Sequence, residues 1–461
     1  MALTGILLGV FLSAHCAAVR SPNRQARTVG QQFYELTPIE ILGFFASRFS
    51  LYVDTSMKAL LLTNEYPPYI YGGAGVHIDY LSRELAKIME VEVRSFGDQE
   101  TDLPNLKVRG FGVNTAIFSC PKNLNSVFGA IRRCIDFNTV GVDADVVHCH
   151  TWYTHFGAIL AKINYYIPMV LTVHSLEPLR PWKREQLGYG YDCSSWVERT
   201  AIEMADAVIA VSEETKRDVL RLFNIDENHI RIIYNGIDPE EYYPRSSRDH
   251  LAKNGINPDQ PYILFVGRIA RQKGIIHLVN AIKYMDPGFQ VVLCAGAPDT
   301  PEIAEEMKQA VAAAQRSHRP GIIWIEKMVT KDVVYELYSH AAVFVCPSIY
   351  EPFGIINLEA MACETAVVAS AVGGIKEVVV DGETGYLVPL EQMLESPFEP
   401  VDPDKFSRDL AERINRLMAD ERLQTKFGWA GRKRAVEKFS WATIAAETKK
   451  DVRVVEKLDR C

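Results

Sequence analysis

Short apolar runs rich in β-branched residues alternate with helix-forming segments from residue 57 almost to the C-terminus. Two such runs, residues 57–63 and 262–268, each lead through a glycine-containing loop into a helical pattern. Continuous apolar runs of this length are typical of strands buried on both faces, and strands that alternate with helices usually pair in parallel. The alternation therefore predicts an α/β protein with two doubly wound, Rossmann-like sheets that bind ligands at the carboxyl ends of their strands.

The chain length predicts two domains. A single hydrophobic core usually divides well below 461 residues, and residues 243–261 are polar and contain prolines, as linkers often do. We predict a first Rossmann-like domain over residues 57–250 and a second over residues 251–438, which face a central cleft. Residues 439–461 are amphipathic, so we expect a helix that crosses back to the first domain.

Residues 1–56 precede the first predicted strand and show no clear periodic pattern. Residues 3–12 are apolar and are followed by small residues, but no basic residue stands before them as in a secretory signal. We interpret residues 1–56 as a leader, or as the result of a start codon assigned too far upstream, and expect them to be disordered. A genuine secretory signal is the alternative.

Charge and cysteine content argue against several classes of protein. The net charge of −8 gives no general attraction to nucleic acid or to an anionic membrane, and no later apolar run reaches the roughly 18 residues of a membrane span. Nine cysteines without a Cys-x-x-Cys pair indicate a reducing compartment. We expect a cytoplasmic protein that binds neither nucleic acid nor membrane, and a homo-oligomer is possible.

The stretch from Pro347 to Glu359 is expected to hold part of the ligand site. An apolar run typical of a strand precedes it, and strong helix-forming residues begin near its end. The segment is therefore predicted to form a strand, a loop and a helix. Glu351 is then expected in the crevice at the strand end, and Glu359 on the helix. The free backbone N–H groups near Gly354 and Ile355 are suited to a phosphate.

Two cations on another strand end suggest which ligand binds. Arg268 and Lys273 lie on a glycine-containing loop, where each can bind a diphosphate; a solvated basic loop that includes Arg271 is the alternative. Glu359 can accept hydrogen bonds from the paired hydroxyls of a ribose. Together with Glu351, which would face a sugar, these residues indicate a nucleoside diphosphate sugar.

Transfer of a glycosyl group from such a donor requires two kinds of stabilisation. Arg268, Lys273 and the N–H groups near Gly354 and Ile355 would stabilise the departing diphosphate, and Glu351 could stabilise a cationic, oxocarbenium-like sugar. His174, at the end of another predicted strand, could hydrogen-bond to the donor sugar, although a structural role is the alternative.

Two glycines near the N-terminal end of the first domain form a second candidate binding loop. Gly72 and Gly73 follow the first predicted strand and precede a helix. Glycine allows a ligand to approach the backbone closely, although a simple tight turn would also use two glycines.

Three further patterns of charged residues and histidines have simpler explanations. His148 and His150 lie on one face of a strand, but no second ligand pair has useful spacing, so we predict no metal site. The Asp-Ala-Asp of residues 143–145 precedes a strand and therefore lies at the wrong edge of the sheet. The basic segments 181–184 and 432–434 are expected to be solvated, and the first could also line an acceptor channel.

From residue 57 onwards the chain resembles the retaining glycosyltransferases of GT-B fold that include glycogen synthases and sucrose synthases. The resemblance rests mainly on the motif Glu351-x7-Glu359. Further matching motifs are Gly267-Arg268 with Lys273-Gly274, Thr172-Val173-His174 and Gly72-Gly73. Within this group the phrases at 65–77, 175–183 and 294–302 are most similar to the actinobacterial-type glycogen synthases, also described as α-maltose-1-phosphate synthases.

The resemblance implies a substrate pair and a role for each matching residue. ADP-glucose would be the donor, α-1,4 transfer would retain configuration, and neither a metal nor another cofactor would be needed. Arg268 and Lys273 would bind the diphosphate, Glu359 the ribose, and Glu351 and His174 the glucose. Gly72 and Gly73 would lie near the phosphate and the acceptor, so the first domain would be the acceptor side and the second the nucleotide-sugar side.

Two departures from bacterial and plant starch synthases affect the acceptor. Those enzymes have Lys-x-Gly-Gly where this chain has Ile70-Tyr71-Gly72-Gly73, and His-Asp-Trp where it has His150-Thr151-Trp152. These departures argue against the classical mode of glucan binding and favour a small phosphorylated acceptor, so both an α-1,4-glucan and glucose 1-phosphate stay open as acceptor. A GT-B enzyme that uses UDP-glucose, or a lipid or small-molecule acceptor, is the alternative, and a non-catalytic sugar-binding protein is less favoured because Glu351, Arg268 and Lys273 are all present.

Overall fold

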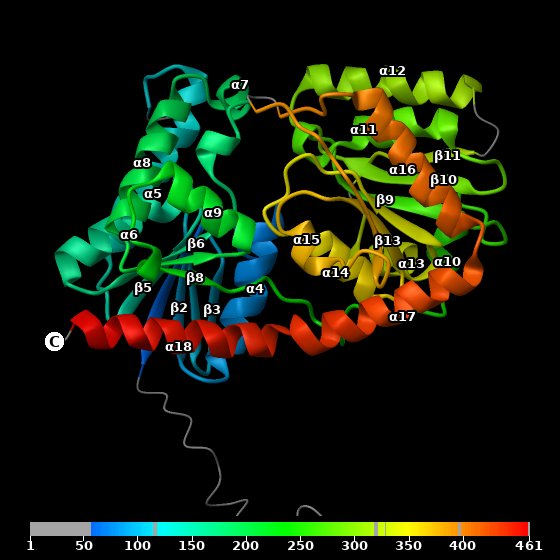
Figure 1. Cartoon of the computed structure of the whole chain (residues 1–461). Coiled ribbons are helices and arrows are strands. Elements are labelled where there is room, and N and C mark those ends of the chain that lie inside the picture. Colours follow the sequence, from blue (N-terminus) through cyan, green and yellow to red (C-terminus); the bar gives the residue numbers. More distant parts are fainter. Residues whose placement is uncertain (1–56, 114–117, 318–320, 328, 395–397, 460–461) are drawn as a thin grey trace, which may run out of the picture. The chain divides into compact units, whose positions relative to one another are not determined.

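The computed structural model describes residues 57–113, 118–317, 321–327, 329–394 and 398–459. Two sheets form its framework (Figure 1). The prediction of a disordered leader or secretory signal over residues 1–56 lies outside these residues.

The first sheet has eight strands in the order β3-β4-β2-β1-β5-β6-β7-β8. All neighbours pair in parallel except β3 with β4, which form an antiparallel hairpin at one edge. The expectation of a wholly parallel first sheet was therefore wrong at this edge, where only the two residues of a short turn separate the strands. The strands are β1 (Lys58–Thr63), β2 (Glu90–Phe96), β3 (Glu100–Leu103), β4 (Leu106–Phe111), β5 (Val146–His150), β6 (Met169–Val173), β7 (Ala207–Ala210) and β8 (Ile230–Ile232).

The second sheet has six strands, all parallel, in the order β11-β10-β9-β12-β13-β14. Its strands are β9 (Tyr262–Arg268), β10 (Gln290–Gly296), β11 (Ile322–Ile325), β12 (Val343–Cys346), β13 (Ala366–Ser370) and β14 (Gly385–Val388). Both sheets confirm the predicted α/β class with two Rossmann-like domains.

Helices cover both faces of each sheet (Figure 1). Along β1, Leu61 packs into one apolar cluster while Leu60 and Leu62 pack into another, which explains the continuous apolar sequence. The first domain contains α4 (Gly73–Ala86), α5 (Asn125–Thr139), α6 (Trp152–Tyr165), α7 (Lys183–Leu187), α8 (Gly190–Met204) and α9 (Glu213–Leu222). The second contains α10 (Asp249–Lys253), α11 (Ile275–Ala281), α12 (Pro301–Ser317), α13 (Lys331–His340), α14 (Ile355–Ala362), α15 (Ile375–Val378), α16 (Pro403–Met418) and α17 (Glu421–Lys438).

The predicted crossover helix is α18 (Trp441–Asp459), which follows α17 directly (Figure 1). Trp441 is 4% exposed and stacks on Tyr80 of α4, with ring centroids 5.6 Å apart. Ile444 and Ala445 join the apolar cluster of the first sheet. Helix α18 therefore packs on the first domain, although the helix before it packs on the second.

The expectation that the basic segment 432–434 is solvated was wrong for two of its residues. Arg432 and Arg434 of α17 are not simply solvated: Arg432 donates to the carbonyl oxygens of Tyr242 and Ala362, and Arg434 to that of Val378 at 2.9 Å. Carbonyls at element ends need donors, and the long arginine side chain reaches them.

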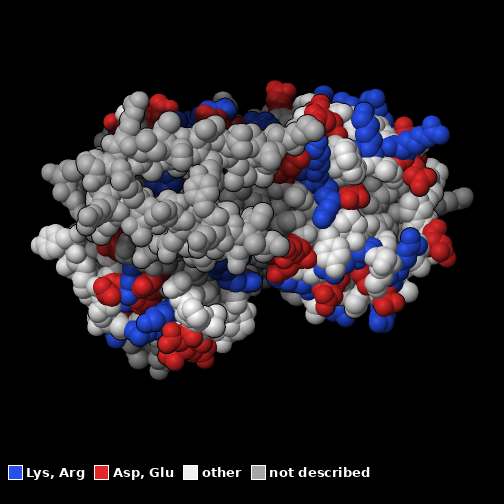
Figure 2. Space-filling model, turned by 90° about the horizontal axis from the view of Figure 1, so that it is seen from below, with Lys and Arg blue, Asp and Glu red and all other residues white. Residues whose placement is uncertain are grey.

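On the coloured part of the face shown in Figure 2, basic and acidic side chains are interspersed.

Candidate functional site

Each sheet has one point at which the strand order reverses. In the first sheet the chain runs outward from β1 to β2 and later resumes at β5 on the other side of β1; in the second it does the same between β9 and β12. Loops that leave adjacent parallel strands in opposite directions open a crevice at their carboxyl ends. The predicted site residues Arg268 and Lys273 follow β9, and Glu351 follows β12, so they flank this crevice.

Lys273 and Glu351 form an ion pair at the second switch point. The Lys273 Nζ lies 2.6 Å from Glu351 Oε2, and Ser348 Oγ donates to the same oxygen at 3.3 Å. The two loops are also joined through their backbones, because Ile349 N donates to Gln272 O at 2.9 Å. The sequence predicted both residues in one crevice but not that they would pair.

Gly274 explains how these two loops approach so closely. It has a φ of 60°, and a Cβ at this position would lie 2.0 Å from the carbonyl oxygen of Pro347. Only glycine avoids both the left-handed backbone strain and this overlap.

Arg268 is held by partners from both domains. Its Nη1 forms an ion pair with Asp299 at 2.5 Å and donates to the Tyr71 hydroxyl at 3.0 Å. The guanidinium also lies over the Tyr71 ring, 4.7 Å from its centroid. Asp299 belongs to the motif 294–302, but nothing in that motif predicted its pairing with Arg268.

Gly354 and Ile355 begin α14, as predicted. Gly354 is in the left-handed region, with a φ of 96°, and Ile355 is the first helical residue. Across the crevice, a Cβ on Gly73 would lie 3.8 Å from Ile355 Cδ1. The structure therefore brings the predicted glycine loop of the first domain and the predicted helix start of the second together.

Glu359 is fixed by two tyrosines. Tyr242 donates to its Oε1 at 3.1 Å and Tyr338 to its Oε2 at 2.8 Å. Burial raises the pKa of Glu359, although the two hydroxyl donors oppose this shift. Each carboxylate oxygen keeps a second lone pair, which a ribose hydroxyl can use.

Gly373 and Gly374, for which the sequence predicted no role, pack against the backbone of Glu351. Gly373 has a φ of 50°, and a Cβ on it would lie 1.9 Å from Glu351 O; Gly374 N donates to that same carbonyl at 3.1 Å. The signal in the sequence was a Gly-Gly directly after a predicted strand. It could have been interpreted as a second loop at the same edge of the sheet.

Glu65 is the functional candidate that the sequence reading missed in the first domain. Its Oε2 accepts hydrogen bonds from the backbone N–H groups of Tyr71 and Gly72, at 2.8 and 2.7 Å. It thereby orders the loop that carries Gly72 and Gly73. Gly75 is required here as well, because a Cβ on it would lie 2.8 Å from Glu65 Cβ.

His174 directly follows β6 and is half-buried beside a cluster of buried histidines. Its Nε2 is 3.1 Å from His150 Nδ1, and its ring centroid is 4.7 Å from that of His77. Burial, reinforced by neighbouring imidazoles, lowers the pKa of His150 and His174 well below the usual range and that of His148 to about 3. These side chains are therefore neutral near pH 7, and a neutral His174 can either donate to or accept from a hydroxyl.

The histidines whose ring nitrogens come closest to a metal-binding geometry include only one of the two that the sequence indicated. Each of His77, His150 and His174 offers a ring nitrogen within 4.8 Å of the other two. The sequence had drawn attention to His148 with His150, whereas His77 enters from α4, far away in the chain. The absence of a resident metal stays a prediction.

The Asp-Ala-Asp of residues 143–145 and the basic segment 181–184 both have structural partners. Asp143 and Asp145 both hold Lys58 at the start of β1, opposite the crevice. Of the segment 181–184, Lys183 is buried and pairs with Glu177 at 3.0 Å, so the expectation that it is solvated was wrong. A buried cation needs such a partner.

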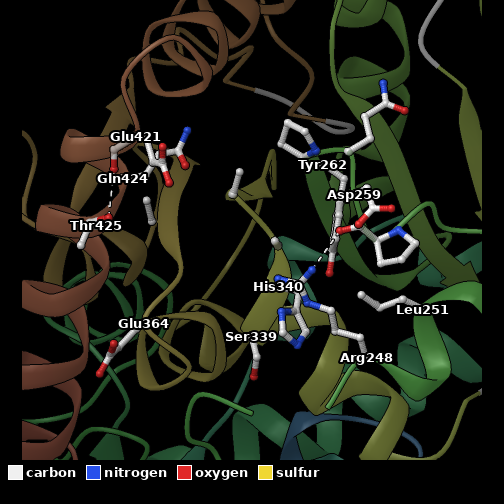
Figure 3. A pocket seen from close by; sticks show the side chains of 16 residues that line it. Arg248, Leu251, Asp259, Tyr262, Ser339, His340, Glu364, Glu421, Gln424 and Thr425 are labelled. Carbon is white, nitrogen blue, oxygen red and sulfur yellow. Dashed lines mark hydrogen bonds between the residues drawn. The ribbon is translucent and has the colours of Figure 1, made fainter. Parts of the chain in front are cut away.

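A cavity of about 580 Å³ lies away from the switch points. It is lined by residues at the starts of strands, including Tyr262, together with His340 and Thr425 (Figure 3). These are the amino ends of the parallel strands. The cavity is therefore not the candidate active site, although it is larger than the other cavity described, of about 380 Å³.

Two mainly parallel sheets with loops that face each other across their switch points define a GT-B glycosyltransferase. Residues 71–241 match Glycosyltransferase Family 4, and residues 246–396 match the glycosyl transferases of group 1. The chain is 47% identical over 400 residues to the α-maltose-1-phosphate synthase of Mycolicibacterium smegmatis, which covers 85% of this chain and 98% of that protein. The chain therefore belongs to this glycosyltransferase family, and it is a hexosyltransferase.

Two solved structures agree with this fold. Sucrose-phosphate synthase from Thermosynechococcus elongatus has a TM-score of 0.70 at 24% identity, covering 87% of this chain and 99% of that one. Anabaena HepE, solved with UDP-glucose, has a TM-score of 0.65 at 19% identity, covering 86% and 100%. In the part of the chain that the structure describes, no helix is long and apolar enough to cross a membrane.

Proposed function

We propose that this enzyme transfers glucose from ADP-glucose to the 4-hydroxyl of glucose 1-phosphate, with retention, to form α-maltose 1-phosphate. The observation that carries the proposal is the 47% identity to an enzyme named for this product, over almost the whole of that enzyme. The Lys273–Glu351 pair at the switch point supports it, because the pair stands where a nucleotide sugar would place its reactive end.

In this proposal the donor lies against the second sheet. Arg268 and Lys273 bind the diphosphate, the N–H groups at Gly354 and Ile355 assist them, and Glu359 holds the ribose. The complex of Anabaena HepE with UDP-glucose supports a nucleotide sugar as donor for this fold. Both cations already have carboxylate partners, Asp299 and Glu351, so they are positioned before the donor arrives.

The reaction breaks the bond between the donor glucose C1 and the diphosphate oxygen, and forms a bond between C1 and the acceptor oxygen. The acceptor hydroxyl proton passes to the departing diphosphate, whose negative charge Arg268 and Lys273 stabilise. As positive charge develops on the sugar ring, the Glu351 carboxylate stabilises it, and His174 hydrogen-bonds to a sugar hydroxyl. No metal or other cofactor takes part in this proposal.

The residues expected on the acceptor side argue against a glucan as the acceptor. Thr151 has a φ of 65° and donates to Asn64 Oδ1 at 2.7 Å, so it joins the β1 and β5 loops instead of presenting a carboxylate. Ile70 likewise supplies no charge where starch synthases have a lysine. A small acceptor that carries its own phosphate fits these departures better than a neutral glucan does.

The test is a matrix of donors and acceptors with the purified full chain. ADP-glucose and UDP-glucose are each offered glucose 1-phosphate or glycogen, with and without EDTA, and nucleotide release and product mass are measured. We expect fastest turnover with ADP-glucose and glucose 1-phosphate, and no effect of EDTA. Transfer to glycogen alone, or only from UDP-glucose, would contradict the proposed acceptor or donor.

The seven cysteines within the described residues are all free thiols, and five of them are buried. This supports the proposal that the enzyme works in the reducing cytoplasm, where free thiols persist and where nucleotide sugars are substrates.

A further inference from the structure

The loop after β6 carries three cations, and one of them has no acidic partner. Lys183 pairs with Glu177, and Arg184 pairs with Asp192 at the surface. Arg180, by contrast, forms no ion pair with any described residue; its Nη1 donates to Ser175 Oγ at 3.0 Å, and its buried Nε has no hydrogen-bond partner. Buried donors are normally satisfied, so this guanidinium has unused binding capacity.

The charges around Arg180 leave it as the excess cation. Glu177 is balanced by Lys183, and Ser194 donates to the other Glu177 oxygen at 2.9 Å. Burial and the neighbouring Glu177 carboxylate raise the pKa of Glu198 well above its usual range, which favours the neutral acid. Arg180 in turn helps to lower the pKa of Lys183, after burial itself.

The position of Arg180 is at the edge of the crevice. Ser175, which it contacts, directly follows His174, and the next residue, Leu176, donates its N–H to the Tyr350 hydroxyl at 3.4 Å. Tyr350 directly precedes Glu351. The guanidinium is therefore anchored next to the hydrogen bond that connects the loop after His174 with the loop of Glu351, the two residues expected to face the transferred glucose.

We infer that Arg180 binds the phosphate of the acceptor glucose 1-phosphate, which makes it the residue that selects a phosphorylated acceptor over a neutral one. This inference rests on the proposed function. A phosphate monoester carries close to two negative charges at pH 7, and a guanidinium offers it a planar pair of donors.

The experiment compares the full-length wild type with Arg180→Gln, Arg180→Lys and the control Arg199→Gln. Arg199 lies on α8 of the same domain, is exposed and pairs with Glu203, so its substitution removes the same charge without touching the crevice. KM and kcat are measured for glucose 1-phosphate and separately for ADP-glucose. Melting temperatures are recorded for all four proteins.

We expect Arg180→Gln to raise the KM for glucose 1-phosphate about 10- to 100-fold, the scale of losing charge-assisted hydrogen bonds. Its KM for ADP-glucose should stay within about threefold of wild type, and Arg180→Lys should be intermediate because it keeps the charge but not the fork. An unchanged acceptor KM, or parallel losses for both substrates with a lower melting temperature, would overturn the inference.

Failure of the proposed function gives a different result. If the wild type transfers no glucose to glucose 1-phosphate, binding of glucose 1-phosphate is measured by calorimetry on wild type and Arg180→Gln. Weaker binding to Arg180→Gln would keep the phosphate site and discard the acceptor, whereas equal binding, or none to either protein, would overturn the site.

Discussion

At the scale of single residues, the Lys273–Glu351 pair keeps a cation and an anion in contact where opposite charges will develop during reaction. The pair is 2.6 Å long, and both side chains are largely buried. The two side chains need to reorganise little when the substrate binds. The diphosphate replaces Glu351 as the partner of Lys273, and the sugar replaces Lys273 as the partner of Glu351.

We predict that Lys273→Ala and Glu351→Ala each lower kcat by at least about 10²-fold, the usual scale for one electrostatic stabiliser. The two variants should differ in donor binding: Lys273→Ala should weaken binding of ADP, whereas Glu351→Ala should not, because it releases Lys273. Stopped assays give kcat, and calorimetry gives the Kd of ADP. Arg271→Ala, on the same loop, is the control and should retain wild-type rates; a Lys273→Ala variant as active as Arg271→Ala would favour the solvated basic loop.

A second prediction at this scale concerns Gly274. Gly274→Ala places a methyl 2.0 Å from Pro347 O, so the loop that carries Lys273 must move. Gly255 also has a positive φ, of 79°, but a Cβ there would meet nothing within 4 Å, so Gly255→Ala measures backbone strain alone. We expect Gly274→Ala to melt at a lower temperature than Gly255→Ala and to lose at least about tenfold in kcat. Equal behaviour of the two variants would show that the close approach is unimportant.

At the scale of elements, the sequence predicted most strands and the loops that carry chemistry. Buried strands have a strong local signature, and strand ends in a parallel sheet converge on one edge whatever the details of packing. The roles of Glu65 and His77 could not be predicted in this way. Glu65 acts through the backbone of a loop, and His77 reaches the site from a helix, so both depend on tertiary packing.

The β3–β4 hairpin shows a different limit. Its strands are short, all four residues of β3 are exposed, and the alternation of Leu106 and Val108 is confined to β4. Such a weak pattern does not distinguish a hairpin from a loop. The same holds for Arg180, whose sequence context indicated a basic segment but not which of its cations would remain unpaired.

The buried histidines of α4, α6 and β5 give the first sheet a pH dependence. Burial lowers the pKa of His155 to about 3 and that of His77 to about 4, whereas an unfolded histidine titrates near 6.5. Between these values the unfolded chain binds more protons, so stability is complete above about pH 6.5 and falls as the pH decreases.

We therefore predict that the urea midpoint falls between pH 7 and pH 5, and that His155→Leu reduces this dependence by up to about 1.4 kcal/mol per pH unit. His229→Leu, at an exposed position, is the control and should leave the slope unchanged. Urea unfolding at several pH values measures this slope. A His155→Leu slope equal to that of the wild type would contradict the assignment of a neutral, buried imidazole.

At the scale of the whole molecule, the C-terminal segment connects the two domains a second time. Ile237 N donates to Phe439 O at 2.7 Å, and a Cβ on Gly236 would lie 2.5 Å from the Trp441 ring. Lys331 of α13 also donates to Tyr80 at 3.1 Å, beside the ring on which Trp441 stacks. Trp441 is therefore the point at which α18, α4 and the connection between the sheets meet.

We predict that Trp441→Ala destabilises the protein by about 3–5 kcal/mol, the range for removing a buried large aromatic side chain, and that α18 detaches before either sheet unfolds. Limited proteolysis followed by mass spectrometry should show early cleavage after residue 440 in this variant. Trp429→Ala is the matched control: Trp429 belongs to α17 and is 63% exposed, so its loss should change stability by less than about 1 kcal/mol. If Trp441→Ala were cleaved like the wild type, attachment of α18 would not depend on Trp441, and the second connection would have to rest on the backbone hydrogen bond between Ile237 and Phe439.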